Sequence, residues 1–130
     1  MLPVVTLEEH DTQLLKGVLV LILLRLLAEQ PSYGYELVGR VRDAGLPGVA
    51  EGSVYPALAR LERDGHLTTE MVPAPAGPPR KYFHLSSSGI EFMRNRVSAW
   101  TSLVGVVASL LAPPGAIDEE VSTCRVYVPN

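Results

Sequence analysis

The residues best suited to chemistry lie on one face of a segment that begins near Glu51 and ends at Gly65. At 100° per residue one stripe of this segment is apolar and is expected to pack inward; it consists of Val54, Leu58, Leu61 and Gly65. The opposite face carries short polar groups and arginines, with an aromatic ring on its flank; these are Ser53, Pro56, Arg60, Arg63 and Tyr55. Such side chains suit contacts to the phosphates and base edges of DNA. An ordinary solvated helix face is the alternative, because Glu62 and Asp64 alternate with the arginines.

The start of the preceding helix and the edge of the following hairpin carry further side chains that suit phosphate contacts. Ser32 is predicted to cap a helix that continues with Tyr33 and Tyr35, and tyrosine hydroxyls there would bind phosphates beside the positive end of the helix dipole. The alternative for both tyrosines is packing under the hairpin, which we favour for Tyr35. Arg80 and Lys81 follow a proline-rich loop, where a wing would meet phosphates, and a solvated charge pair is their alternative.

The elements that position these residues follow from apolar periodicity, capping residues and turn formers. Helices are expected from between Thr6 and Asp11 to Glu29, from Ser32 to Gly45 with Leu37, Val38 and Val41 inward, from Glu51 or Ser53 to Gly65, and from Ser87 or Ser88 to Ala112. Strands are expected over Leu67–Val72 and Lys81–Leu85, on either side of the proline-rich segment 73–79. This order describes a mainly α fold with a small β-hairpin, a winged helix-turn-helix followed by a long C-terminal helix.

The long final helix carries an apolar seam of the kind that joins two helices. Its members recur at positions spaced by seven and between them; they are Ile90, Met93, Val97, Trp100, Val104, Val107 and Leu111. The first helix is apolar on nearly every side, so one small domain cannot cover all of this surface. We therefore expect a homodimer in which the last helix packs against the partner's first helix. Trp100 is expected to be a core aromatic of this seam, and the alternative is a stacking surface for a flat ligand in the dimer interface.

Composition limits the chemistry available to the chain. With 130 residues, 47% of them hydrophobic, it can form one small domain and an appendage. A single cysteine, Cys124, excludes an internal disulfide framework. The three histidines, His10, His66 and His84, lack the spacing of metal ligands, and neither a phosphate-binding glycine loop nor a nucleophile elbow is present. We therefore expect no enzyme activity, no cofactor and no metal site.

The charge distribution and the apolar runs indicate the compartment and the partner. The net charge is −3, but residues 31–100 hold eight basic and seven acidic residues, while the remaining segments hold three basic and seven acidic ones. The acidic ends are thus compatible with a locally basic face in the middle of the chain. The apolar run Val18–Leu24, extended by Leu26–Ala28, is far shorter than the ~20 residues of a membrane span. We expect a cytoplasmic protein with no membrane partner.

Several stretches match one known family in order. They are Leu14–Gly17 before an apolar helix, Pro31–Leu37, Glu51–Leu58 with Arg60–Glu62 and Asp64–Gly65, and Gly77–Phe83 with Leu85 and Gly89. Together they span about residues 14–100 and resemble the PadR family of bacterial transcriptional regulators. The acidic N-terminal extension and the tail after Pro113 depart from the family pattern.

The resemblance implies a homodimeric winged-helix protein, usually a repressor, that binds a palindromic operator. By position, Tyr55 and Pro56 match the recognition helix of the family, and Arg80 and Lys81 match its wing. The single C-terminal helix is similar to that of the shorter PadR subfamily. Some of those relatives bind flat aromatic drugs between aromatic side chains at the dimer centre, and Trp100 lies on the equivalent helix.

The sequence therefore predicts a repressor that contacts double-stranded operator DNA, a second copy of itself and a small aromatic effector. Its expected organisation is an N-terminal arm and winged helix-turn-helix over 1–86, a dimerisation helix over 87–112, and a tail of unknown role over 113–130. The alternative is a winged-helix module that binds another protein without specific DNA binding.

Overall fold

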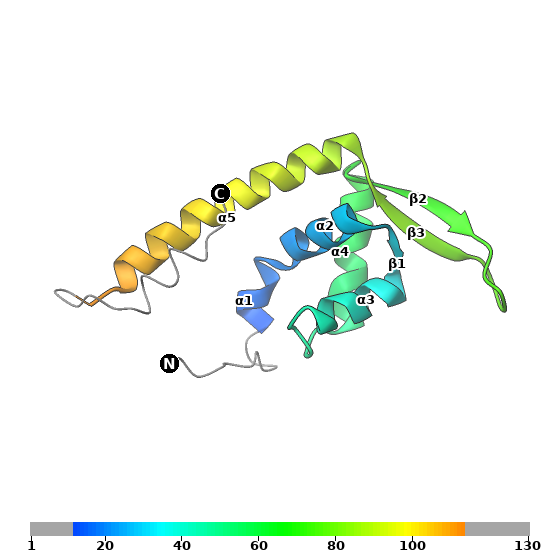
Figure 1. The fold of residues 1–130 in the computed structure, drawn as a ribbon, viewed down its shortest axis with the longest axis horizontal. Helices are drawn as coiled ribbons and strands as arrows, with labels where there is room; N and C mark the ends of the chain where they lie inside the picture. The colour runs from blue at the N-terminus through cyan, green and yellow to red at the C-terminus, as the bar shows by residue number, and fades with distance from the viewer. Residues whose placement is uncertain (1–11, 114–130) are drawn as a thin grey trace. The chain divides into compact units, whose positions relative to one another are not determined.

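The computed structural model describes residues 12–113 of the chain, which fold as five helices and three short strands (Figure 1). In chain order these are α1 (Thr12–Lys16), α2 (Leu19–Glu29), β1 (Ser32–Tyr33), α3 (Gly34–Asp43), α4 (Glu51–Arg63), β2 (Leu67–Val72), β3 (Arg80–Leu85) and α5 (Ser87–Leu111). The described residues form two compact units, and the boundary between them lies inside α5, between Met93 and Arg94. The first unit is the expected winged helix-turn-helix.

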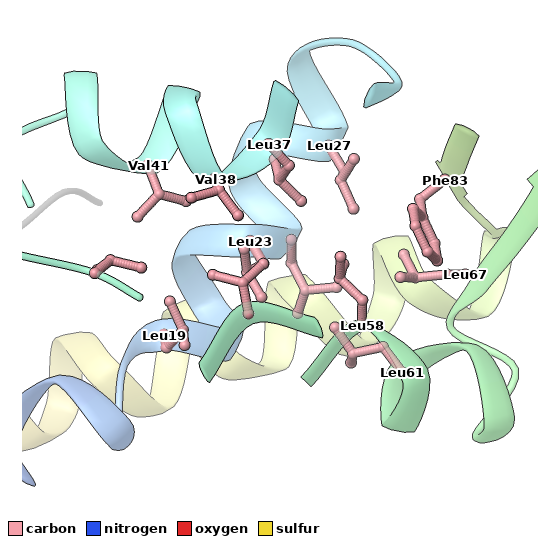
Figure 2. Packing of buried hydrophobic residues seen from close by; sticks show 13 residues of the cluster. Leu19, Leu23, Leu27, Leu37, Val38, Val41, Leu58, Leu61, Leu67 and Phe83 are labelled. Atoms are coloured by element: carbon pink, nitrogen blue, oxygen red, sulfur yellow. The ribbon is translucent and has the colours of Figure 1, made fainter. Parts of the chain in front are cut away.

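The core of this first unit lies where α2, α3 and α4 meet the sheet (Figure 2). Each helix contributes one apolar stripe, and the largest fully buried side chains include Leu23, Leu24, Leu37 and Leu58. The inward stripes expected for the second and third helices are confirmed for Leu37, Val38, Val41, Val54, Leu58 and Leu61, which are all buried. Gly65, expected on the same stripe, is instead exposed in the turn that follows α4, which ends at Arg63. Burial of such side chains is the main source of stability in a domain of this size.

The sheet contains the expected hairpin and one additional strand. Strand β2 pairs antiparallel with β3, with Leu67 opposite Leu85 and Val72 opposite Arg80. The expected strand ranges are confirmed, apart from the start of β3 one residue earlier, at Arg80. The additional strand, β1, pairs Ser32 with Phe83 on the other edge of β3, so the order is β1-β3-β2. Two residues carry no periodicity of their own, and only their pairing with β3 makes them a strand.

Two expectations about helix ends were wrong. The first helix is not continuous, because a turn at Gly17 and Val18 separates α1 from α2, and the Val18 N–H donates to the Leu15 carbonyl at 3.0 Å. Its expected start between Thr6 and Asp11 lies outside the described residues. Ser32 does not cap the second helix, which begins at Gly34 after an extended Tyr33 and has no side-chain cap.

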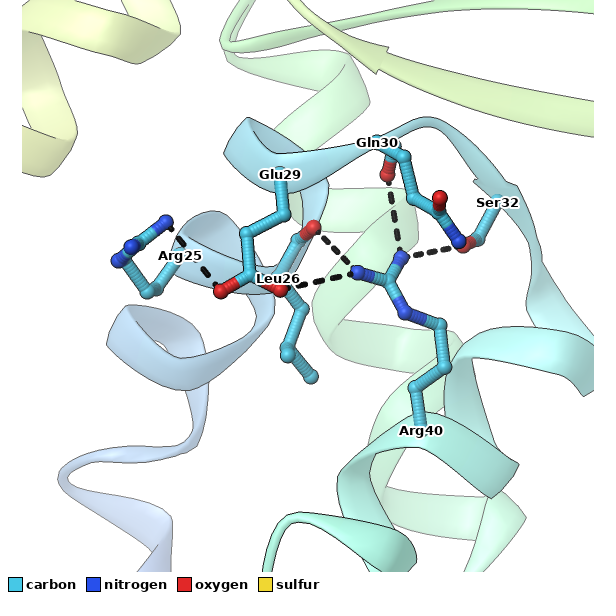
Figure 3. A network of polar contacts seen from close by, with 6 residues as sticks. All are labelled: Arg25, Leu26, Glu29, Gln30, Ser32 and Arg40. Atoms are coloured by element: carbon cyan, nitrogen blue, oxygen red, sulfur yellow. Dashed lines mark hydrogen bonds and ion pairs between the residues drawn. The ribbon is translucent and has the colours of Figure 1, made fainter.

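Ser32 instead belongs to a polar network centred on Arg40 (Figure 3). The Arg40 guanidinium donates to the Ser32 hydroxyl at 2.6 Å and to the carbonyls of Leu26 and Gln30 at 2.8 and 3.1 Å. These carbonyls lie at the end of α2, where the helix supplies few further N–H donors. A cation at this position is also stabilised by the negative end of the helix dipole. Arg40 therefore ties the end of α2 and strand β1 to α3.

Helix α5 begins at Ser87, within the expected range, and the serine before it fixes this start. The Ser86 hydroxyl accepts the Gly89 N–H at 3.0 Å and donates to the Gly65 carbonyl at 2.7 Å. Ser86 is thus the N-cap of α5. Gly89 packs directly against the His66 carbonyl, leaving no room for a Cβ. The turn after α4 and the first turn of α5 are therefore joined by close backbone contact.

From Arg94 onward the second unit consists of the rest of α5, and much of its apolar surface is exposed. Large side chains exposed there include Trp100, Leu103, Val106, Leu110 and Leu111, with Leu110 at 78%. Within residues 12–113, no helix combines the length and hydropathy that a membrane crossing requires. The expected tail lies almost wholly outside the described residues.

We expect Arg40→Ala to lower the free energy of unfolding by about 2–3 kcal/mol, because it leaves the buried Ser32 hydroxyl and the last carbonyls of α2 without their charged donor. Urea unfolding followed by far-ultraviolet circular dichroism measures the change. Arg25→Ala is the matched control: it removes an exposed ion pair with Glu29 and should cost no more than about 0.5 kcal/mol. Equal losses in the two variants would contradict a central role for Arg40.

Candidate nucleic-acid interface

The outward face of α4 carries every side chain that the sequence analysis assigned to it. Pro56, Arg60 and Arg63 are exposed, Tyr55 is 42% exposed, and Ser53 is half-buried. They point away from the core because Val54, Leu58 and Leu61 hold the opposite stripe inside. Pro56 lies within the helix and has no N–H, so the carbonyl of Gly52 lacks its usual helical donor. This face therefore offers two guanidinium groups, two hydroxyls and an additional backbone acceptor.

Beside this face lies an open hollow of about 400 Å³ between α4, the start of α3 and strand β3. Its lining consists of four aromatic residues, two cations, one carboxylate and two small residues; these are Tyr33, Tyr35, Tyr55, Phe83, Arg80, Lys81, Glu62, Gly34 and Ala59. The hollow thus brings together residues from four elements that are up to 50 positions apart. Its phenolic hydroxyls and cations are the donors that phosphate oxygens accept from.

A glycine makes the close approach of α3 and α4 possible at this hollow. A Cβ on Gly34 would collide with the ring of Tyr55, so only glycine allows that ring to lie over the first turn of α3. Partial burial raises the pKa of the Tyr55 phenol, and the nearby charges of Glu51 and Tyr35 raise it further. The phenol therefore stays protonated at neutral pH and remains a hydrogen-bond donor.

The two wing cations have different partners within the protein. The Arg80 guanidinium carbon lies 4.6 Å from the centre of the Tyr33 ring, which in turn packs at 5.3 Å against the ring of Tyr82. A guanidinium stacked through its face keeps its N–H donors at the edge of its plane. Lys81 instead places Nζ 3.0 Å from Oε1 of Glu62. Arg80 is therefore oriented by an aromatic ring and Lys81 by an opposite charge.

The structure brings some of the expected contact residues together and removes one. Tyr33, Tyr55, Arg80 and Lys81 all line the hollow, whereas Ser32 is completely buried, does not line it and cannot reach a ligand. Ser32 was assigned because a serine before a helical pattern resembles a cap, but the structure uses it as an acceptor for Arg40.

Two residues of the hollow were missed or misjudged from the sequence. Tyr35 does not pack under the hairpin, since it is 67% exposed, and that expectation was wrong. From the sequence, Glu62 was considered only as a negative charge that weakens the basic character of α4. In the structure it contacts both strands of the hairpin. The position of Glu62 near the end of α4, next to the buried Leu61, was the available signal.

Comparison with known proteins identifies the family. The sequence pattern of the transcriptional regulator PadR-like family matches residues 23–95. The chain is similar in structure to a PadR-like transcriptional regulator from Bacillus cereus, with 33% identity, a TM-score of 0.69, and coverage of 78% of this chain and 98% of that one.

Two further structures agree with this assignment. A Streptococcus transcriptional regulator is 38% identical, with a TM-score of 0.69 and coverage of 77% of this chain and 98% of that one. A PadR family transcriptional regulator from Eggerthella lenta is 33% identical, with a TM-score of 0.71 and coverage of 78% and 88%. The winged helix-turn-helix, its sequence pattern and these similarities together show that the chain belongs to the PadR-like family of transcriptional regulators.

Proposed function

We propose that this regulator represses transcription by binding a palindromic operator as a homodimer, with α4 in the major groove and the β2–β3 hairpin against the flanking backbone. The observation that carries the proposal is the surface formed by the outward face of α4 and the adjoining hollow. It presents arginines, tyrosine hydroxyls and a stacked wing guanidinium on one side of the winged unit.

The residues of this surface divide into two roles. Ser53, Tyr55, Pro56, Arg60 and Arg63 would face the major groove, where arginine reads guanine and short polar groups reach either bases or phosphates. Tyr33, Tyr35 and Arg80 would contact the sugar-phosphate backbone, which gives affinity without sequence preference. Lys81 lies on the same wing and would reach a phosphate only as far as its ion pair with Glu62 leaves it available. Ser32 is left out of the proposed contacts because it is buried.

Self-association through α5 is the second part of the proposal. The seam residues Ile90, Trp100, Val107 and Leu111 are all more than a third exposed, and Leu103, Val106 and Leu110 widen the same apolar surface. Residues 97–112 contain no charged side chain. Covering an apolar helix surface of this kind lowers the free energy of the system. In a symmetric dimer, the second copy supplies an identical apolar surface that can cover it.

A small planar effector is the third part. Trp100 is 39% exposed, lies in the seam and is the only tryptophan of the chain. In a symmetric dimer, two copies of a central seam residue come close to the two-fold axis, where their rings could enclose a flat aromatic molecule. Binding there would change the separation of the two recognition helices and so release the operator.

DNA binding is tested with duplexes from the protein's own genome and with random-sequence duplexes over a range of salt concentrations. We expect preference for a palindrome with half-sites about one helical turn (~10 base pairs) apart, and a steep fall of affinity with salt. Arg80→Ala should weaken binding to both kinds of duplex alike and lower the salt slope by about 1 per winged unit. Arg25→Ala, which removes the same charge from α2, is the control and should change neither. A flat salt response in the unmodified protein would favour a module that docks another protein.

The dimer is tested with Val97→Asp, which places a charge in the centre of the proposed seam. We expect the variant to become monomeric or insoluble and to lose operator binding, because the unpaired carboxylate would be desolvated in the interface. Ser98→Asp puts the same charge on the neighbouring exposed position and should leave the dimer intact. Analytical ultracentrifugation distinguishes the two, and an intact Val97→Asp dimer would mean that the seam was placed wrongly.

The effector site is tested by fluorescence, because all indole emission comes from Trp100. Planar aromatic compounds should quench this emission saturably, and those that quench should also release operator DNA. Trp100→Phe should retain the dimer and DNA binding while weakening the response to these compounds. Failure of every compound in a broad panel to quench would place Trp100 in the core of the seam.

A further inference from the structure

The carboxylate of Glu62 reaches both strands of the wing from α4. Its Oε1 lies 3.0 Å from Nζ of Lys81 on β3, and its Oε2 accepts the hydroxyl proton of Thr69 on β2 at 3.2 Å. Both contacts lie at the surface, where the side chains of Glu62 and Lys81 are 35% and 47% exposed. A single side chain near the end of the recognition helix therefore holds the hairpin at two points.

The register of the sheet explains why these three residues meet. Thr69 is opposite Phe83 and Met71 is opposite Lys81, so Thr69 and Lys81 share one face of the hairpin with the buried ring of Phe83. Lys81 extends over that ring, with Nζ 5.5 Å from its centre. The Glu62–Lys81 ion pair thus lies beside the Phe83 ring in the lining of the hollow.

We propose that Glu62 is a positioning residue that withholds Lys81 from DNA phosphate and so limits the affinity of the wing. The proposal rests on the proposed function, namely DNA binding through α4 and the hairpin. A phosphate that approaches Lys81 meets a cation whose charge is already compensated, and it also meets the repulsion of a carboxylate in the same hollow. To bind Lys81, the phosphate must either break the ion pair or lie next to the Glu62 carboxylate, which has the same negative charge.

Arg80, the adjacent residue on β3, provides the contrast. It is stacked on an uncharged ring, so its positive charge is not compensated by that contact. Neighbouring wing cations thus differ: the Arg80 charge acts on an approaching duplex, while the Lys81 charge is largely cancelled by Glu62. The sequence pair Arg80-Lys81 behaves as one effective phosphate contact instead of two.

The test is a double-mutant cycle on random-sequence duplex DNA, read by fluorescence anisotropy at several salt concentrations. Glu62→Gln keeps the shape of the side chain and an oxygen for Thr69 but removes the charge. We expect it to tighten binding about 3- to 10-fold at ~0.1 M salt and to steepen the salt slope by about 1 per winged unit, as one more phosphate contact would. Lys81→Met, which keeps the aliphatic stem over Phe83, should change affinity less than about 2-fold in the unmodified protein but cancel the gain in the Glu62→Gln background.

Glu70→Gln is the matched control for general charge removal. Glu70 is also on the wing, but it pairs with His84 at 3.0 Å rather than with a lysine. Any gain from Glu70→Gln should be smaller, and Lys81→Met should not cancel it. Glu62→Gln that leaves affinity unchanged or weakens it would overturn the proposal. The proposal would also be overturned if Lys81→Met changed the affinity for DNA equally in the unmodified protein and in the Glu62→Gln variant.

Two results separate this proposal from the one on which it rests. If the unmodified protein binds DNA with a steep salt dependence and Glu62→Gln has no effect, only the role of Glu62 is wrong. If neither the unmodified protein nor any variant shows salt-dependent binding, the proposed function fails, and this role of Glu62 fails with it. Non-additive shifts of the urea midpoint in the same variants report the Glu62–Lys81 contact without any DNA.

Discussion

Burial of a single stripe of α4 determines the direction of every other side chain on that helix. Val54, Leu58 and Leu61 are each at most 3% exposed, because α2, α3 and the sheet close over them. Rotation of α4 by one residue would expose these groups and bury Arg60 or Glu62, depending on its direction, a change that costs several kcal/mol without a partner for the charge. The core therefore determines which side chains of α4 face outward. The candidate nucleic-acid interface is held in place by the same packing.

The same constraint explains the residues that surround α4. The Tyr55 ring can lie over α3 only because Gly34 has no side chain, and α3 is held to the end of α2 by the contacts of Arg40. Glu62 follows the buried Leu61 and is thereby aimed at the hairpin. The hollow beside α4 is therefore shaped by the packing of Tyr55 over Gly34 and by the polar contacts of Arg40 and Glu62.

Features with a period or a local rule could be predicted from the sequence, and features that depend on distant partners could not. The stripe of α4, the inward residues of α3 and the hairpin strands follow from spacing alone and are confirmed. Strand β1 consists of two residues that become a strand only by pairing with β3, and this pairing places Ser32 in the core rather than at a helix start. Tyr35 was misjudged for a related reason, because its exposure depends on where β3 lies.

The net charge of −3 says little about whether the winged unit can bind a polyanion. Two acidic side chains near the wing have particular partners: Glu62 forms an ion pair with Lys81, and Glu70 contacts the imidazole of His84. Such pairs contribute only about 0.2–1 kcal/mol to folding when exposed, so stability alone gives them little reason to persist near a surface that must attract phosphates. Under the proposed role of Glu62, its pair with Lys81 acts mainly on an approaching duplex, because it compensates a wing cation that would otherwise neutralise a phosphate. If the proposal holds, the sequence-independent part of the affinity depends on where the carboxylates lie as well as on the number of cations.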